Sequence, residues 1–119
     1  MGDCMEIGEK QNMNKKIKTE AVDHLFDAIL TLKDSDECYK FFEDVCTINE
    51  LLSLSQRYEV AKMLREGKTY LEIAEKTGAS TATISRVNRS LNYGSDGYDM
   101  VFSRLLKGYD PEKGKNTEE

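Results

Sequence analysis

Residues 69–91 read TYLEIAEKTGASTATISRVNRSL. This stretch predicts two short helices joined by a tight turn, the helix-turn-helix arrangement that presents its second helix to the DNA major groove. Thr69 and Glu72 have the spacing of a capping box for the first helix, and Ser80 can cap the second. Gly78 lies at the corner, where the backbone needs conformational freedom.

The second helix of this stretch has an apolar face and a small, polar face. Ile84, Val87 and Leu91 recur at intervals of three and four residues, so they share the inward face. Short hydroxyl side chains and Ala let a helix approach base edges closely, and Arg can reach guanine or phosphate. The sequence therefore predicts DNA binding. The predicted contact residues are Thr69, Lys76, Ser80, Thr81, Ala82, Thr83, Ser85, Arg86 and Arg89.

Charge is unevenly distributed along the chain. The net charge is −5, which taken alone argues against a protein that binds polyanions. Residues 55–92 hold seven Lys or Arg and four Glu, so this segment carries 7 − 4 = +3 and the remainder carries −8. A locally basic segment is compatible with docking on DNA, and its small charge favours a dimer that doubles the contact. The acidic total keeps open the alternative of a helix-turn-helix-shaped module that binds protein during transcription.

The chain as a whole predicts an all-α fold of about six helices. It contains one Pro, and no run of alternating apolar and polar residues is long enough to indicate a strand. The expected helices span about 14–33, 35–46, 47–67 with a possible new start at Ser55, the two of the 69–91 stretch, and 98–106. The predicted layout is a flexible N-terminus over residues 1–13, a single domain over 14–108, and a flexible tail over 109–119.

The apolar residues predict where the core and an interface lie. The first helix is apolar over much of its circumference, more than one small subunit can bury, so the sequence favours a homodimer. Leu71 and Ile73 are expected on the buried side of the first helix of the motif, and Ala74 at its crossing with the second. The next expected core set is Cys38, Tyr39, Phe42, Val45 and Cys46.

Other classes of protein find little support in the sequence. No stretch has the length and apolarity of a membrane helix, and the start lacks the features of a signal peptide, so a cytoplasmic protein is expected. The three cysteines have neither a close pair nor His partners, so no disulfide framework or metal site is predicted. His24 could pair with Asp27, but no nucleophile or phosphate loop accompanies them. We therefore predict no enzyme, no catalytic residue and no cofactor.

Beyond these patterns, the chain resembles the Trp-repressor superfamily, and specifically the TrpR-like YerC/YecD family. Residues 78–86, Gly-Ala-Ser-Thr-Ala-Thr-Ile-Ser-Arg, are similar to the Gly-Ala-Gly-Ile-Ala-Thr-Ile-Thr-Arg run of Trp repressor. The resemblance implies an all-helical, intertwined homodimer that places its helix-turn-helix units in successive major grooves of a pseudo-palindromic operator. It also implies that Thr81, Ala82, Thr83 and Ser85 face the bases.

The resemblance departs from Trp repressor at the corepressor pocket. There the matched Arg is followed by a Gly that leaves room for the indole ring, whereas Val87 follows Arg86 here. The second arginine of that pocket aligns with Gln56, with Arg57 one position away and turned about 100° around the helix. These four residues are the effector-pocket candidates. The substitutions argue against tryptophan and favour a pocket filled by side chains, with another effector as the alternative.

Overall fold

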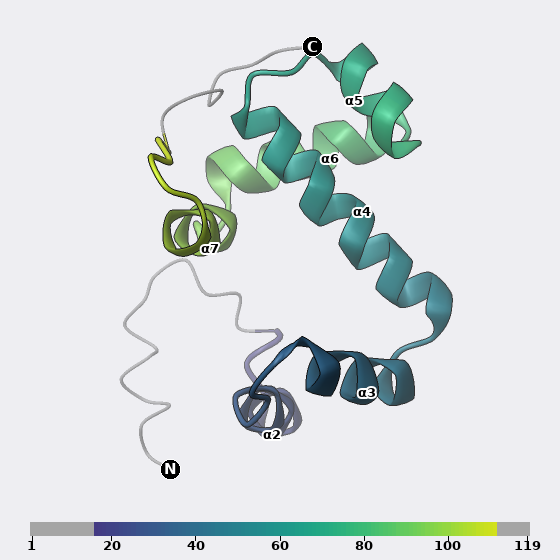
Figure 1. Ribbon diagram of the computed structural model, residues 1–119, viewed down its shortest axis with the longest axis vertical. Coiled ribbons are helices and arrows are strands. Elements are labelled where there is room, and N and C mark those ends of the chain that lie inside the picture. Colours follow the sequence, from purple (N-terminus) through teal and green to yellow (C-terminus); the bar gives the residue numbers. More distant parts are fainter. Residues whose placement is uncertain (1–15, 112–119) are drawn as a thin grey trace. The chain divides into compact units, whose positions relative to one another are not determined.

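The computed structural model describes residues 16–111, and within them it forms six α-helices and no strand (Figure 1). This confirms the predicted all-α fold. The chain divides into two compact units, Met1–Ile48 and Asn49–Glu119. Residues 1–13, predicted to be flexible, lie outside the described part. No helix within residues 16–111 is long and apolar enough to cross a membrane.

The first unit contains α2 (Glu20–Ile29) and α3 (Ser35–Val45). Thr19 caps α2, since its hydroxyl accepts a hydrogen bond from Val22 N at 3.1 Å. This cap explains why α2 begins later than the predicted residue 14. Asp34 caps α3 as predicted, accepting from Glu37 N at 3.0 Å. Local capping chemistry therefore sets where both helices start.

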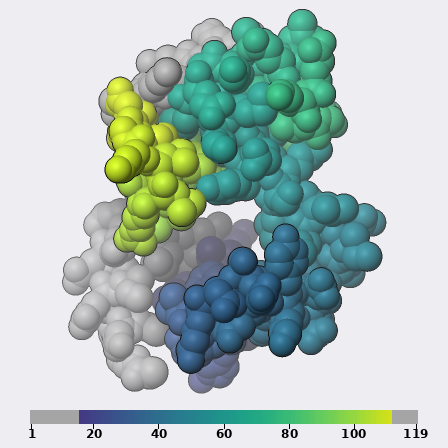
Figure 2. Space-filling model, viewed as in Figure 1, coloured from purple at the N-terminus to yellow at the C-terminus, as the bar shows by residue number. Residues whose placement is uncertain are grey.

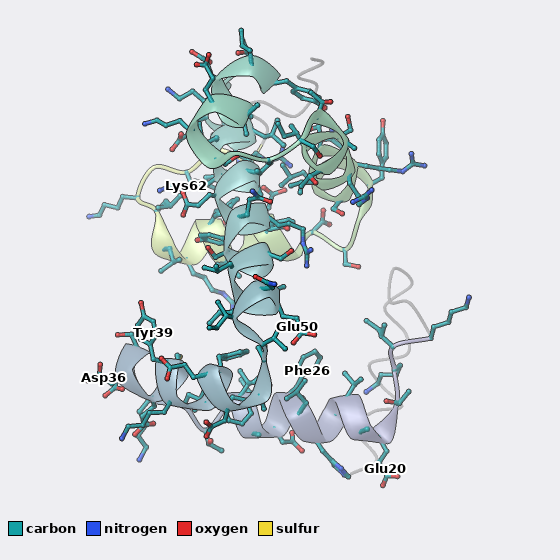
Figure 3. The ribbon with its side chains drawn as sticks, turned by 90° about the vertical axis from the view of Figure 1, so that its right-hand side faces the viewer. Glu20, Phe26, Asp36, Tyr39, Glu50 and Lys62 are labelled. Atoms are coloured by element: carbon teal, nitrogen blue, oxygen red, sulfur yellow. The ribbon has the colours of Figure 1, made fainter. Side chains whose placement is uncertain are left out.

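Neither α2 nor α3 has a buried residue. Phe26 on α2 is 51% exposed and Tyr39 on α3 is 64% exposed, and Figure 3 shows both side chains projecting from their helices. Cys38 and Val45 are also exposed, whereas the sequence predicts that α3 turns them toward a core. The prediction is therefore wrong for Cys38, Tyr39 and Val45, which are exposed in the described part of the chain.

The second unit contains α4, α5, α6 and α7. Helix α4 (Ile48–Arg65) is continuous, although the sequence suggests a break before Ser55. Two short helices follow, α5 (Tyr70–Thr77) and α6 (Thr81–Tyr93), and α7 (Gly97–Leu105) closes the unit. Their shared core comprises Val60, Ala61, Leu64, Ile73, Ala79, Ile84, Val87, Leu91 and Phe102.

Aromatic rings join α7 to the rest of this core. The Phe102 ring is fully buried, and its centroid lies 5.4 Å from that of Tyr58 on α4 and 5.5 Å from that of Tyr109. The sequence assigns Tyr109 to the flexible tail, yet it is half-buried and packs against the core. The packed part of the second unit therefore extends past Gly108.

Candidate nucleic-acid interface

The helix-turn-helix motif begins with the predicted capping box. Thr69 Oγ1 accepts from Glu72 N at 3.1 Å, and Thr69 N donates to Glu72 Oε1 at 2.9 Å. The hydrogen bond from the Thr69 backbone lowers the pKa of the Glu72 carboxyl below its ordinary value. Helix α5 is thus fixed at its first turn by two side chains of its own segment.

The corner of the motif also has the predicted geometry. Gly78 ends α5 with φ of 76°, in the left-handed region that glycine adopts at least cost. Thr77 Oγ1 donates to Ile73 O at 2.7 Å and accepts from Ala79 N at 3.1 Å. Ser80 then caps α6, because its hydroxyl accepts from Thr83 N at 3.1 Å. The turn is therefore built from short-range contacts that hold α6 at a defined angle to α5.

Helix α6 has the inward and outward faces that its sequence predicts. Ile84, Val87 and Leu91 are each at most 2% exposed. Thr83 is half-buried, and the other predicted contact residues on this helix are exposed: Thr81, Ala82, Ser85, Arg86 and Arg89. No acidic residue occurs in α6. The outward face is consequently small, polar and positively charged.

The three predicted contacts outside α6 lie at the ends of α5 and at the turn. Thr69 and Ser80 are exposed and hold the first turns of α5 and α6. Lys76 is exposed in the last turn of α5, beside a surface groove of about 620 Å³ between α4 and α5. Lys62, labelled in Figure 3, and Lys68 line the same groove. Leu71 was expected on the buried side of α5, but it is 70% exposed.

The four effector-pocket candidates differ in burial and in their contacts. Val87 is 2% exposed and belongs to the core. Gln56 Nε2 donates to Thr77 O at 3.1 Å, so it holds the end of α5. Arg57 Nη1 donates to Ser53 Oγ at 3.2 Å on its own helix, and Arg86 is exposed. Val87 and Gln56 are thus engaged in contacts within the second unit, whereas Arg86 lies at its surface.

One basic residue has a role that the charge pattern does not reveal. Arg65 is 3% exposed, and its guanidinium pairs with Asp99 of α7, with Nε 2.8 Å from Oδ1. Burial lowers the pKa of Arg65, but the hydrogen bonds and charge of Asp99 outweigh it and raise the pKa above its ordinary value. Arg65 lies on the same face of α4 as the buried Ala61 and Leu64, and this helical spacing is the sequence signal that could have indicated its burial. Arg65 therefore does not contribute to an external basic surface.

No set of three or more His, Cys, Asp or Glu side chains within residues 16–111 is arranged to hold a metal ion. The chemistry of the motif is that of polar and cationic groups on a helix surface. A surface of this kind suits hydrogen bonding to base edges and pairing with phosphates.

Comparison with known proteins agrees with this geometry. A model of the Trp repressor protein family matches residues 20–106. The protein YerC of Bacillus subtilis, itself uncharacterized, is 61% identical over 90 residues, covering 76% of this chain and 86% of YerC. A Trp operon repressor homolog of Chlamydia trachomatis is 34% identical over 85 residues, covering 67% of this chain and 86% of that protein.

A solved structure extends the similarity to three dimensions. The crystal structure of a TrpR-like protein from Eubacterium eligens superposes with a TM-score of 0.77 and 79% sequence identity, covering 79% of this chain and 97% of that one. The sequence resemblance is confirmed by these matches. The chain therefore belongs to the Trp repressor family, a family of DNA-binding transcription regulators.

Proposed function

We propose that this protein binds double-stranded DNA sequence-specifically, with α6 as its recognition helix. The observation that carries the proposal is the outward face of α6, which is small, polar, free of acidic residues and exposed next to a rigid corner. A helix of this kind fits the major groove, where each base pair presents a distinct pattern of donors and acceptors.

The outward residues divide into two proposed roles. Thr81, Ala82, Thr83 and Ser85 occupy the first turns of α6, the part of a recognition helix that meets base edges. The cations extend the surface and meet phosphate, with Arg86 also able to reach guanine. The proposed phosphate contacts are Arg86, Arg89, Lys76 and the hydroxyls of Thr69 and Ser80.

We propose that the protein acts as a homodimer on a pseudo-palindromic operator. In the first unit, Phe26, Tyr39 and Val45 are at least half exposed. In the second unit, Leu52 of α4 is 59% exposed and Leu105 of α7 is 65% exposed. Apolar surface of this extent is unfavourable in water, and a second copy of the chain would cover it. Two copies also supply two recognition helices, which increases affinity for two half-sites.

We propose further that DNA binding does not require tryptophan. Val87, which follows Arg86 in the sequence, packs in the core, and the Gln56 side-chain amide donates a hydrogen bond to the Thr77 carbonyl. A bound indole would have to displace both, at the cost of a packed side chain and a helix-end hydrogen bond. We propose that it represses by occupying its operator and that it does so in the cytoplasm.

The experiment that tests the proposal is selection of random double-stranded DNA by the ligand-free protein. The bound pool is sequenced, and the complex is sized by analytical ultracentrifugation at two salt concentrations. We expect an enriched sequence with two-fold symmetry, bound by a dimer, with affinity that falls steeply as salt rises.

Three other results would each contradict part of the proposal. Enrichment only after tryptophan is added would overturn ligand independence. Enrichment of an asymmetric sequence by a monomer would overturn the dimer. Absence of both enrichment and salt-sensitive binding would favour the alternative in which the motif docks on protein.

A further inference from the structure

Arg65 caps the recognition helix from inside the protein. The last four carbonyl groups of a helix have no partner within it, and Leu91 O is one of these in α6, which ends at Tyr93. Arg65 Nη2 donates to Leu91 O at 3.2 Å. A cation at a helix C-terminus also interacts favourably with the helix dipole. Arg65 thus links the end of α4 to the last turn of α6.

The same guanidinium holds α7. Its Nε lies 2.8 Å from Asp99 Oδ1 and its Nη2 lies 3.0 Å from Asp99 Oδ2, a side-on pair with two parallel hydrogen bonds. The side chain of Arg65 is 2% exposed and that of Asp99 is 12% exposed. Because the guanidinium is planar and its donors are fixed, one group sets the positions of α6 and α7 together.

Tyr109 adds the segment after α7 to this arrangement. Its hydroxyl donates to Asp99 Oδ1, and its ring packs against Phe102. In Figure 2 the yellow-green residues of α7 and the following segment lie against the teal part of the second unit. We refer to Arg65, Asp99, Tyr109 and the Leu91 carbonyl as the Arg65 tie.

Buried polar contacts differ from apolar packing in what they specify. Apolar cores tolerate many substitutions and lose uniqueness of packing before stability, whereas a buried charge pair requires well-aligned hydrogen-bonding partners. A buried ion pair often adds little net stability compared with apolar residues of similar size. We therefore expect the Arg65 tie to affect the position of α6 more than the stability of the fold.

We infer that Arg65 is a positioning residue for the recognition helix, and that Tyr109 makes the segment after α7 part of the unit that fixes α6. This inference rests on the proposed function, since it assigns a role in reading DNA to residues that do not touch it. It predicts that replacing the tie changes sequence discrimination more than stability.

The first test is a triple variant, Arg65→Met, Asp99→Leu and Tyr109→Phe, which replaces the tie with apolar groups of similar size. We expect a thermal midpoint close to that of the wild type. The ratio of affinity for the selected operator to affinity for random duplex DNA should fall about tenfold, the effect of misplacing one or two base contacts. An unchanged ratio in a folded variant would overturn the inference.

The matched control is Ser103→Ala. Ser103 also contacts Asp99, but its hydroxyl donates to the main-chain carbonyl at 2.8 Å, outside the tie. We expect the operator-to-random ratio of this variant to equal that of the wild type. An equal loss of discrimination in Ser103→Ala would show that any loosening of α7 suffices, which contradicts a specific role for the tie.

A second test needs no DNA and so separates the tie from the proposed function. Amide hydrogen exchange is compared in the wild type, Tyr109→Phe and Ser103→Ala, each of which keeps the packed side chain nearly intact. We expect Tyr109→Phe to increase exchange several-fold in the last turn of α6 as well as in α7. Faster exchange confined to α7 would overturn the inference, whereas failure to select DNA by the wild type would overturn only the proposed function.

Discussion

Gln56 Nε2 donates a hydrogen bond of 3.1 Å to Thr77 O, which joins α4 to the last residue of α5. Arg65 Nη2 likewise donates to Leu91 O, in the last turn of α6. A single long helix therefore caps the C-termini of both helices of the motif. Each cap satisfies a carbonyl that its own helix leaves unpaired.

Replacing Gln56 with Glu should destabilise the fold. A carboxylate cannot donate to Thr77 O. It also places a negative charge at a helix C-terminus, where its interaction with the helix dipole is unfavourable. We expect the free energy of unfolding to fall by about 1–3 kcal/mol in urea titrations. Glu59→Gln, an exposed change on the same helix, should stay within about 0.5 kcal/mol of the wild type. Equal stability of the two variants would mean that the Gln56 contact contributes nothing.

Gly78 and Gly97 offer a matched pair of Gly→Ala changes. A Cβ would meet nothing within 4 Å at either position, so sterics with neighbours do not differ. Gly78 has φ of 76°, and Ala there should cost about 1–2 kcal/mol of stability. Gly97 begins α7 without a positive φ, and Ala there should be neutral or stabilising by about 0.4–1 kcal/mol. Thermal melts that rank the two variants in the opposite order would contradict the assigned backbone geometry.

The sequence predicts the motif well because its signals are local. The capping box of Thr69, the left-handed Gly78 and the cap of Ser80 each depend on residues within four positions. The apolar stripe of α6 is predicted for the same reason, since helical periodicity alone places its residues on one face. The proposed DNA contacts follow from these local features, and they stay predictions until binding is measured.

The sequence predicts long-range relations poorly. Periodicity cannot show that Arg65 meets Asp99, which lies 34 positions away, or that Tyr109 returns to the core. It places Leu71 on the buried side of α5 with Ile73, although residues two positions apart lie about 200° apart around a helix and Leu71 is 70% exposed. It also extends the first helix well beyond Glu20–Ile29, because apolar residues continue past the capped ends.

High pH should destabilise the protein through Tyr109. Burial, followed by the hydrogen bond to Asp99, raises the pKa of Tyr109 from 10.0 to about 12. A group whose pKa is raised on folding stabilises the fold fully below pH 10, and this contribution disappears as pH rises through 12. In Tyr109→Phe the corresponding loss should be absent. The unfolding free energies of the wild type and Tyr109→Phe should therefore converge between pH 10 and 12. A constant difference between them over this range would contradict the link between the pKa of Tyr109 and stability.

Arg89→Ala should weaken binding to operator and random DNA alike. Arg89 is exposed on α6 beyond the residues proposed to meet bases, where a side chain reaches phosphate. The slope of log affinity against log salt should become shallower by about one unit. Fluorescence anisotropy with both duplexes at several salt concentrations measures both effects. A loss confined to the operator would instead assign Arg89 a base contact.

The affinity of Thr83→Asp for the selected operator shows whether α6 reads the DNA. Thr83 is the third residue of α6. A carboxylate at this position can accept hydrogen bonds from backbone amides and interacts favourably with the helix dipole. The thermal midpoint of the variant should therefore stay close to that of the wild type. The same charge would face the major groove if α6 reads DNA. We predict that affinity falls at least about 100-fold, the effect of an unpaired charge against phosphates and base acceptors. Wild-type affinity in this folded variant would contradict the assignment of α6 as the recognition helix.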